Sequence, residues 1–485
     1  MERIQHVIDG AEVPSADGAT FAVIDPATGE QYAEAAFGRQ ADVDAAVASA
    51  RAAFEEGRWS RLPSPARAAA LRRLGDLIVE RADAIGAVES RDSGKPITQS
   101  VEEVREMAGL LEYYAGLLEE PIGTVYSQPE GYFAYSERVP YGVVGALAPW
   151  NYPFQLAVAK TVPALVAGNT VVLKMAEQTP ASTSLLALLA LEAGIPPGVF
   201  NVVHGDGETT GAALAAHPDV PKLTFTGSTE TGRHIMRAAA EHIKSVHLEL
   251  GGKTANIVLD DADLDQAVAG SLFTGFHNTG QICTSGSRLL LQDSIADEFI
   301  DRLLQGVDRF VVGHPADART NLGPLISQEQ YDRVRAYISL GERAGARLLT
   351  PRPESSPGPG YFVQPAVFDQ VEPTMRIAQE EIFGPVLSVI RFRDMEEAVR
   401  IANGVLYGLA AIVWTNDLRR SFTLSRRLQA GIVWTNCPHF MTWNVPYEGH
   451  RLSGLGEDQG KEALMEFTQL KVNYIAHAGQ VATWP

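Results

Sequence analysis

GVVGALAP (142–149) is the first of five short apolar stretches between Gly142 and Gly252, and the series that they form decides the fold. The other four are TVVLKM (170–175), VFNVVHG (199–205), KLTFTG (222–227) and SVHLELGG (245–252). Segments 154–168, 180–194, 207–217 and 228–242 separate them and have the composition of helices. Short apolar strands that alternate with helices of this length predict βαβ units and a parallel sheet covered on both faces.

A second alternation begins after Gly252. Helices are predicted near 263–277, 294–306, 328–343 and 394–403, and strands at 287–292, 385–392 and 410–415. Helical patterns also cover 63–94 and 99–119, before the first series. The stretch 351–362, rich in Pro, Gly and Ser, is expected to be a loop. The sequence thus predicts two α/β domains.

Segment 130–141 and the tail from 466 have a different, strand-like texture. The tail would suit pairing with another strand, for example the 130–141 ribbon of a neighbouring subunit. A homo-oligomer, either a dimer or a tetramer, is therefore expected.

Charge and cysteine content exclude several classes of protein. The chain has 485 residues with 40 Lys and Arg against 59 Asp and Glu, a formal net charge of −19, which disfavours nucleic acid as a partner. No apolar run of membrane-spanning length and no signal-peptide core occur, so a cytoplasmic protein without membrane contact is expected. Its two cysteines cannot build a disulfide framework and argue against structural zinc, and no metal is expected. Cys437 is expected to be a packing residue.

Polar groups follow four of the five predicted strands. Parallel strands bring their carboxyl ends to one edge of the sheet, where ligands bind. Each residue also has a structural alternative: a turn for Asn151, helix caps near Glu177 and Ser228, and a paired carboxylate for Glu249. The usual G-x-G-x-x-G fingerprint does not follow the first strand. The groups in question are Asn151, Lys174 with Glu177, Gly227 with Ser228, and Glu249.

Cys283 lies among small and polar residues in FHNTGQICTSG (276–286). A nucleophilic cysteine needs hydrogen-bond donors for an oxyanion and a base within reach. Asn151 offers a side-chain amide and Glu249 a carboxylate. The residues alone leave a catalytic thiol and an inert buried thiol equally open.

APWNYP (148–153), KMAEQTP (174–180), FTGSTETG (225–232), LELGGK (248–253), FHNTGQICTSGSR (276–288) and EEIFGP (380–385) together resemble the signature motifs of the NAD(P)-dependent aldehyde dehydrogenase superfamily. The motifs occur in the family's order and at its spacings, and the resemblance covers essentially the whole chain. It implies an α/β protein with a Rossmann-like, parallel-sheet NAD-binding domain (1–122 and 142–251). A second α/β catalytic domain (252–452) and a small β oligomerisation ribbon (123–141 and 466–485) complete that fold.

The resemblance also implies roles for individual residues. Cys283 would be the nucleophile, Asn151 with the Cys283 amide the oxyanion hole, and Glu249 the base that activates water. An aldehyde would be oxidised by NAD⁺ to the carboxylic acid through a thiohemiacetal and a thioester on the cysteine. The implied cofactor contacts are Pro149 and Trp150 along the groove, Lys174 and Glu177 at the adenine ribose, Gly227 and Ser228 at the pyrophosphate, Glu381 at the nicotinamide ribose, and Phe383 near the nicotinamide.

The chain departs from the family pattern near its C terminus and at Met175. Arg451 stands where the family has Lys, Glu457 where it has Arg, and Asp458 where it has a Glu that can relay protons from the base. Two alternatives remain: a CoA-acylating semialdehyde dehydrogenase, which often lacks the base, and a non-enzymatic scaffold on the same fold.

CTSGSR (283–288) and NCPHFMTWNVP (436–446) are similar to the betaine aldehyde and aminobutyraldehyde dehydrogenases. Those enzymes oxidise aldehydes with a cationic end, which carboxylates or aromatic faces would bind. Glu103 and Glu106 fall where plant aminoaldehyde dehydrogenases carry an acidic pair; otherwise they are a solvated helix face, with Tyr113 and Tyr114 in the core. Tyr152, Trp443 and Tyr447 could supply aromatic walls. Ala159 stands where the plant enzymes have a Trp in the aromatic cage around the substrate cation. Without that Trp, 4-aminobutyraldehyde is favoured over betaine aldehyde. A broad-range or semialdehyde substrate remains an alternative.

Overall fold

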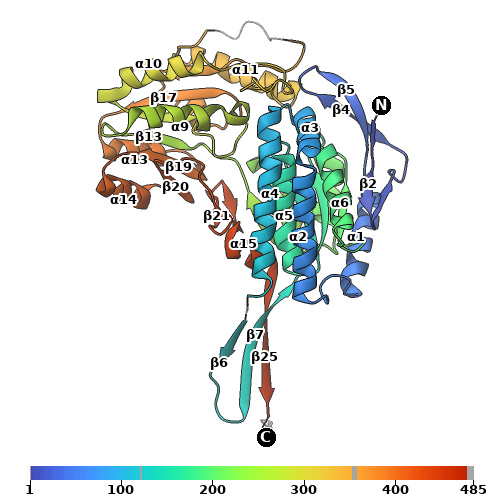
Figure 1. The fold of residues 1–485 in the computed structure, drawn as a ribbon. Helices are drawn as coiled ribbons and strands as arrows, with labels where there is room; N and C mark the ends of the chain where they lie inside the picture. Colours follow the sequence, from blue (N-terminus) through green and yellow to red (C-terminus); the bar gives the residue numbers. More distant parts are fainter. Residues whose placement is uncertain (1, 121–122, 352–357, 478–485) are drawn as a thin grey trace.

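The computed structural model describes residues 2–120, 123–351 and 358–477. It holds two large sheets side by side and a narrow ribbon that projects from the body (Figure 1). Parts of the predicted loop 351–362 and of the predicted ribbon, namely 352–357 and 478–485, lie outside the described residues. In the described part of the chain, no helix combines the length and apolar character needed to cross a bilayer.

The first large sheet has the predicted parallel strands at its centre. Their order is β12-β11-β8-β9-β10, so the chain starts in the middle, at β8, and adds strands on both sides. The carboxyl ends beside β8 therefore form the point where ligands bind in such sheets. Antiparallel β23 extends one edge, and β2 and β3 extend the other. The strands are β2 (His6–Ile8), β3 (Ala11–Val13), β8 (Val143–Ala148), β9 (Thr170–Met175), β10 (Phe200–Val203), β11 (Lys222–Thr226), β12 (Ser245–Glu249) and β23 (Gly454–Leu455).

Helices cover both faces of this sheet, as the sequence predicts. One core cluster joins the sheet to α2 (Ser64–Glu80), α4 (Ile97–Leu117), α5 (Pro153–Val166) and α6 (Ala181–Glu192). The cluster on the other face includes α1 (Gln40–Glu55), α7 (Ala212–Ala216) and α8 (Thr229–Ala240). The predicted helix 207–217 begins with a π-helical turn, Gly207–Gly211.

The predicted helix 63–94 is two helices, α2 and α3 (Ala82–Ser93), which meet at Arg81. Arg81 has a backbone φ of −112° and ψ of 11°, which breaks the helical hydrogen-bond ladder. The break lets α3 take its own direction and pack on α4: a Cβ at Gly86 would come within 2.8 Å of the Val101 Cα atom. Apolar spacing continues through such a break, so the pattern alone does not reveal it.

The second large sheet is parallel except for one edge strand and confirms the second predicted alternation. Its strands are β15 (Arg347–Leu348), β16 (Ala366–Asp369), β17 (Val386–Phe392), β14 (Arg288–Gln292), β13 (Ala255–Val258), β19 (Ala410–Trp414) and β20 (Ile432–Thr435), in spatial order. Its helices are α9 (Leu264–Phe276), α10 (Ala296–Val307), α11 (Gln328–Arg343), α12 (Arg376–Gln379), α13 (Met395–Asn403) and α14 (Leu418–Arg427).

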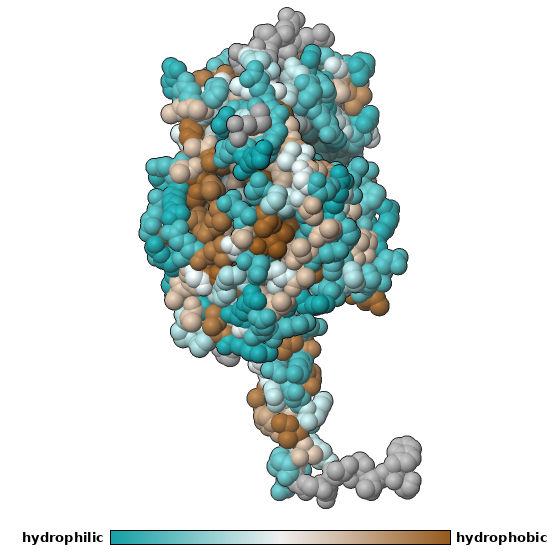
Figure 2. All heavy atoms as spheres, turned by 90° about the vertical axis from the view of Figure 1, so that its right-hand side faces the viewer, coloured by the Kyte–Doolittle hydropathy of each residue, from teal (hydrophilic) through white to brown (hydrophobic). Residues whose placement is uncertain are grey.

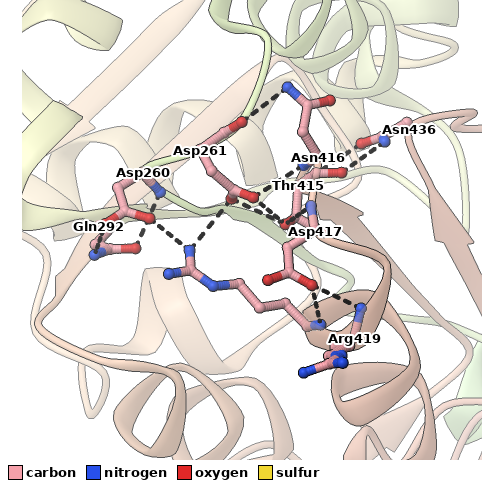
Figure 3. A network of polar contacts seen from close by, with 9 residues as sticks. Asp260, Asp261, Gln292, Thr415, Asn416, Asp417, Arg419 and Asn436 are labelled. Atoms are coloured by element: carbon pink, nitrogen blue, oxygen red, sulfur yellow. Dashed lines mark hydrogen bonds and ion pairs between the residues drawn. The ribbon is translucent and has the colours of Figure 1, made fainter.

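A polar network fixes the turn between β19 and α14 (Figure 3). The Asp261 carboxylate accepts hydrogen bonds from the Thr415 hydroxyl at 2.9 Å and the Asn416 amide at 3.1 Å. Asp417 caps α14 by accepting from the backbone of Arg419. The network ties the carboxyl ends of β13 and β19 together, on the side of the domain that carries α14.

The ribbon consists of β6 (Gly123–Tyr126), β7 (Tyr132–Pro140) and β25 (Thr468–Ala476). The predicted pairing of the tail with the 130–141 ribbon is confirmed, but its assignment to a neighbouring subunit is wrong for the described part: β25 pairs antiparallel with β7 of the same chain, from Thr468 opposite Pro140 to Ala476 opposite Tyr132. The closing strand follows α15, which packs on the first domain, so its own β7 lies within reach. Apolar side chains remain exposed along the ribbon (Figure 2).

Residues 447–466 cross between the two large sheets. The segment contains β21 (Tyr447–Glu448), β22 (His450–Arg451), β23, β24 (Glu457–Asp458) and α15 (Gly460–Glu466), and β22 pairs with β18 (Tyr407–Gly408) of the second domain. It therefore brings Tyr447 and Asp458 to the junction of the domains. A separate sheet of β1 (Glu2–Ile4), β5 (Glu30–Ala36) and β4 (Thr20–Asp25) completes the fold.

Candidate active site

A cavity of about 610 Å³ runs between the carboxyl ends of the first sheet and the second domain. It gathers most of the residues that the sequence singles out, from segments far apart in the chain. Lys174 and Glu177 are not among its walls. The predicted residues that line it are Glu103, Glu106, Pro149, Trp150, Asn151, Tyr152, Gly227, Ser228, Glu249, Cys283, Glu381, Phe383, Trp443 and Tyr447.

The loop before Cys283 is held in an uncommon backbone conformation. Asn278, Thr279 and Gly280 have φ values of 48°, 56° and 73°, three consecutive residues in the left-handed region. Only glycine fits at 280, because a Cβ there would lie 2.3 Å from the Gly384 carbonyl oxygen. The loop therefore packs directly on the EEIFGP segment. A local strain of this kind is typical of functional sites and places Cys283 against the cavity.

Asn151 is buried and tied to the cysteine loop. Its side-chain amide donates to the Gln281 carbonyl at 3.0 Å, and its own carbonyl accepts from the Asn278 side chain at 2.8 Å. The turn alternative for Asn151 does not account for these links across 127 to 130 residues of sequence. They place the Asn151 side-chain amide beside Gln281, two residues before Cys283.

The Cys283 thiol is partly covered and lies 3.5 Å from the Tyr447 hydroxyl. Burial raises the pKa of this thiol to about 12, while hydrogen bonds from Tyr447 and from the Thr284 backbone oppose that shift. The nearby carboxyls of Glu249 and Glu381 raise the pKa further. Without a cation beside it, Cys283 is thus held as a neutral thiol. Cys437 is exposed in the turn after β20, so its prediction as a packing residue is wrong.

Glu249 ends β12 and is buried. Loss of hydration raises the pKa of its carboxyl well above the usual range, and the neighbouring Asp458 carboxylate adds to the shift. Its Oε1 atom has no hydrogen-bond partner. A buried carboxyl with one unpartnered oxygen, in a cavity that also holds a thiol, is suited to accept a proton.

Asp458 lies behind Glu249 and pairs with a lysine that the sequence reading missed. Lys160, fully buried on α5, places its Nζ 2.6 Å from Asp458 Oδ2. Among the described residues, His247, Glu249 and Asp458 form the one group with metal-binding potential, with ligand atoms within 4.8 Å of one another. The Lys160 ammonium already supplies a positive charge there. Lys160 follows Asn151 by nine residues, and the signal available in the sequence was a lysine within the otherwise apolar stretch that forms α5.

Lys174 and Glu177 lie next to each other at the end of β9. The Lys174 ammonium is buried and lies 3.3 Å from the Glu177 carboxylate, whose side chain is 39% exposed. Burial lowers the pKa of Lys174, and Glu177 opposes that shift. The pair offers a partly exposed acceptor and a buried donor at the carboxyl end of β9.

The groove between β11, β12 and the EEIFGP segment presents polar groups to the cavity. Ser228 caps α8 by accepting from the Thr231 amide at 3.0 Å, and the buried Thr226 hydroxyl beside it has no partner. Glu381 accepts from the Gly252 amide at 2.9 Å, and burial raises its pKa to about 7. Trp150 and Phe383 meet edge to face, with ring centroids 5.3 Å apart.

The opposite end of the cavity carries acidic residues of α4, but they differ in setting. Glu103 is buried and ion-paired with Lys95, and its other oxygen lies 3.6 Å from His277 Nε2. The solvated-face alternative is therefore wrong for Glu103. Glu106 is exposed, and partial burial with the neighbouring carboxylates raises its pKa. Neither Lys95 nor His277 is predicted: Lys95 lies just after α3, which packs on α4, and His277 lies just after α9.

The aromatic residues at this end of the cavity also pack against neighbouring elements. The Lys95 ammonium lies 3.8 Å from the centre of the Tyr152 ring and covers one of its faces. The Trp443 indole packs over α4, since a Cβ at Gly109 would come within 2.9 Å of its Nε1 atom. Tyr114 is in the core, as the alternative reading predicts, and Tyr113 packs against it.

Residues 13–473 match the sequence profile of the "Aldehyde dehydrogenase family". Human mitochondrial aldehyde dehydrogenase is 43% identical over 455 residues, which cover 93% of this chain and 88% of that protein. A betaine aldehyde dehydrogenase from Staphylococcus aureus, solved with NAD⁺, superposes with a TM-score of 0.96 at 35% identity and covers 99% of both chains. An indole-3-acetaldehyde dehydrogenase, also solved with NAD⁺, superposes with a TM-score of 0.96 at 40% identity and covers 98% of this chain and 97% of that one. With five of its six motifs represented in the lining of one cavity and these likenesses over nearly its whole length, the chain belongs to the aldehyde dehydrogenase family.

Proposed function

We propose that this chain is an NAD-dependent aldehyde dehydrogenase that oxidises an aminoaldehyde, such as 4-aminobutyraldehyde, to its carboxylic acid. One observation carries the proposal: Cys283, Asn151 and Glu249 line the same cavity as the groove of Trp150, Ser228, Glu381 and Phe383. Relatives solved with NAD⁺ share the fold over nearly its whole length. The cavity has room for a nucleotide at one end and a small substrate at the other.

The residues of the groove fit a dinucleotide. The capped N terminus of α8 offers backbone amides to a pyrophosphate, and the unpartnered Thr226 hydroxyl adds a donor. Glu177 and Lys174 suit ribose hydroxyls, and Glu381 suits a second ribose. When bound, NAD⁺ supplies the hydride acceptor and a positive charge that favours the Cys283 thiolate.

In the first half-reaction, the Cys283 sulfur forms a bond to the aldehyde carbon. The carbonyl oxygen becomes an alkoxide, which the second N–H of the Asn151 side chain and the Cys283 backbone N–H stabilise. Removal of one such donor typically costs about 10²–10³ in rate. As the alkoxide collapses, hydride leaves the carbon and a thioester remains on Cys283.

In the second half-reaction, water must attack the thioester. Glu249, whose raised pKa suits a general base, takes a proton from that water. The carbon–sulfur bond then breaks, the acid is released, and the thiolate is regenerated. The presence of this base argues for water over CoA as the acceptor, and the intact Cys283 and Asn151 argue against a scaffold.

Charge at the substrate end supports an aminoaldehyde. Glu102, Glu103 and Glu106 of α4 all line the cavity, and Glu106 has no ion-pair partner in the described structure. A substrate ammonium could therefore pair with Glu106 at the mouth. Ala159 also lines the cavity and leaves open the place where a cage tryptophan would stand, which suits a primary amine better than a quaternary ammonium.

A neutral aldehyde is the second candidate, because Lys95 already neutralises Glu103 and covers one face of Tyr152. Phe273, Met441 and Trp443 add apolar walls. The test is kcat/KM for 4-aminobutyraldehyde against butyraldehyde, in the wild type and in Glu106→Gln, with Glu112→Gln on the same helix as the control. We expect Glu106→Gln to lower the preference for the aminoaldehyde about tenfold, by loss of one partly screened ion pair. Equal use of both aldehydes with no effect of Glu106→Gln would leave a general aldehyde dehydrogenase.

A further inference from the structure

Two buried polar atoms without hydrogen-bond partners face each other behind the candidate nucleophile. One is Nε2 of His247 and the other is Oε1 of Glu249, and they lie 4.0 Å apart. The same Nε2 lies 3.8 Å from Oδ1 of Asp458. His247 is fully buried. Unsatisfied buried groups are rare and each calls for an explanation.

Strand geometry places these groups together. His247 and Glu249 are two residues apart on β12 and therefore point to the same face of the sheet. Thr224 of β11 is the direct neighbour of His247 in the ladder, and its hydroxyl lies 2.9 Å from His247 Nδ1. Gly456 permits the close approach of the crossing segment, since a Cβ there would come within 2.9 Å of the His247 ring.

The surroundings select one tautomer of a neutral imidazole. Burial and the ammonium groups of Lys160 and Lys222 lower the pKa of His247 well below its usual value, so the ring carries one proton. A lone pair aimed at two carboxyl groups would be repelled, whereas an N–H is attracted. The proton therefore belongs on Nε2, and the Thr224 hydroxyl donates to Nδ1.

We propose that His247 is a positioning residue for the hydrolytic half-reaction, whose Nε2–H closes onto Glu249 Oε1 when that carboxyl becomes ionised. The inference rests on the proposed function, because it assigns a partner to the base of that reaction. At the observed distance of 4.0 Å, Oε1 lies beyond hydrogen-bond range of Nε2. In the ionised state, the charge draws the N–H into a bond, which stabilises the carboxylate and fixes its direction toward the thioester.

A hydrogen bond from His247 changes the pKa of Glu249 in a known direction. A hydrogen bond to the charged form lowers the pKa of a carboxyl, so His247 offsets part of the increase that burial and Asp458 impose on Glu249. Loss of this hydrogen bond must raise the pKa of Glu249. The acid limb of deacylation, the low-pH range in which the rate falls as Glu249 becomes protonated, must therefore move to higher pH. Other charged groups near His247 and Glu249 are unchanged by such a substitution: Lys160, Lys222, Glu448, Asp458 and Glu466.

The experiment follows decay of the acyl-enzyme directly. The wild type, His247→Leu, His247→Gln and Thr224→Val are mixed with NAD⁺ and butyraldehyde, then quenched over time at pH 5.5 to 9, and the mass adduct on Cys283 is measured. His247→Leu removes the donor, and we expect its acid limb to move up by about one pH unit, with about tenfold slower decay below it. Glutamine keeps an N–H near the Nε2 position and should restore most of the rate. Thr224→Val keeps the fold and loosens the tautomer, so it should shift the limb in the same direction by less.

His6→Leu is the matched control, because His6 is equally buried in the first sheet but distant from Cys283. It should leave the acid limb in place. A limb within about 0.2 pH units of wild type in both His247→Leu and Thr224→Val would overturn the role of His247. If the wild type formed no adduct on Cys283 at all, the proposed function would fail, and this inference with it.

Discussion

The sulfur of Cys283 and the hydroxyl oxygen of Tyr447 lie 3.5 Å apart, although the two residues come from the second domain and from the segment that crosses back to the first. Either group can be the donor at this distance; with the phenol as donor, the hydrogen bond lowers the pKa of the thiol and opposes the effect of burial. Closure of the two domains around the cavity is thus linked to the reactivity of the thiol.

Tyr447→Phe should make Cys283 less reactive. Loss of the donor raises the pKa of the thiol above its already high value of about 12, so alkylation by iodoacetamide at a given pH should slow several-fold. Peptide mass mapping follows each cysteine separately. Exposed Cys437 serves as an internal control whose rate should not change. Faster or equal alkylation of Cys283 in the variant would show that Tyr447 does not support the thiolate.

Glu177 should make the protein prefer NAD⁺ over NADP⁺. A 2′-phosphate beside this carboxylate meets like charge, at an expected cost of about 1–3 kcal/mol, or about 5- to 150-fold in affinity. Glu177→Gln leaves the Lys174 ammonium without its partner and should therefore improve NADP⁺ use more than it harms NAD⁺ use. The measurement is kcat/KM for both cofactors. Equal values in the wild type would contradict the assignment.

Asp458→Asn should destabilise the fold and shift the pH profile. The buried Lys160 ammonium loses its carboxylate at 2.6 Å, which should cost about 3–5 kcal/mol in urea unfolding. The double variant Lys160→Met/Asp458→Asn should recover much of that loss. Because the Asp458 charge raises the pKa of Glu249, its removal should also move the acid limb of kcat to lower pH. A single variant as stable as the wild type would mean that the pair is solvated.

The ribbon should mediate self-association. Leu470 and Tyr474 are 56% and 74% exposed on β25, more than an isolated apolar strand tolerates in water. Leu470→Glu/Tyr474→Glu should reduce the mass measured by light scattering, while Lys471→Glu on the same strand should not. An unchanged mass in the double variant would place the contacts elsewhere.

Residues at the ends of predicted strands could be located from the sequence because the parallel alternation fixes where strands end. Asn151 and Ser228 follow β8 and β11, Glu249 ends β12, and the Cys283 loop could be recognised by its small and polar residues. Residues that are brought to the site by contacts between distant segments could not be located from the sequence. Lys95 and His277 reach Glu103 from the segments that follow α3 and α9. His247 is one polar residue in an apolar strand, and its partners become visible only when β11 and the crossing segment are placed beside it. The break at Arg81 does not interrupt the apolar spacing, and the sequence does not show that β25 pairs with the ribbon of its own chain.

The central claim is that Cys283 carries the substrate as a thioester that Glu249 helps water to release. The direct measurement is intact-protein mass spectrometry of Glu249→Gln after mixing with NAD⁺ and an aldehyde. We expect a burst of about one NADH per site, slow turnover, and an acyl adduct that maps to Cys283 and is absent in Cys283→Ala. Rapid turnover by Glu249→Gln without an adduct, or aldehyde oxidation by Cys283→Ala at the wild-type rate, would contradict the account.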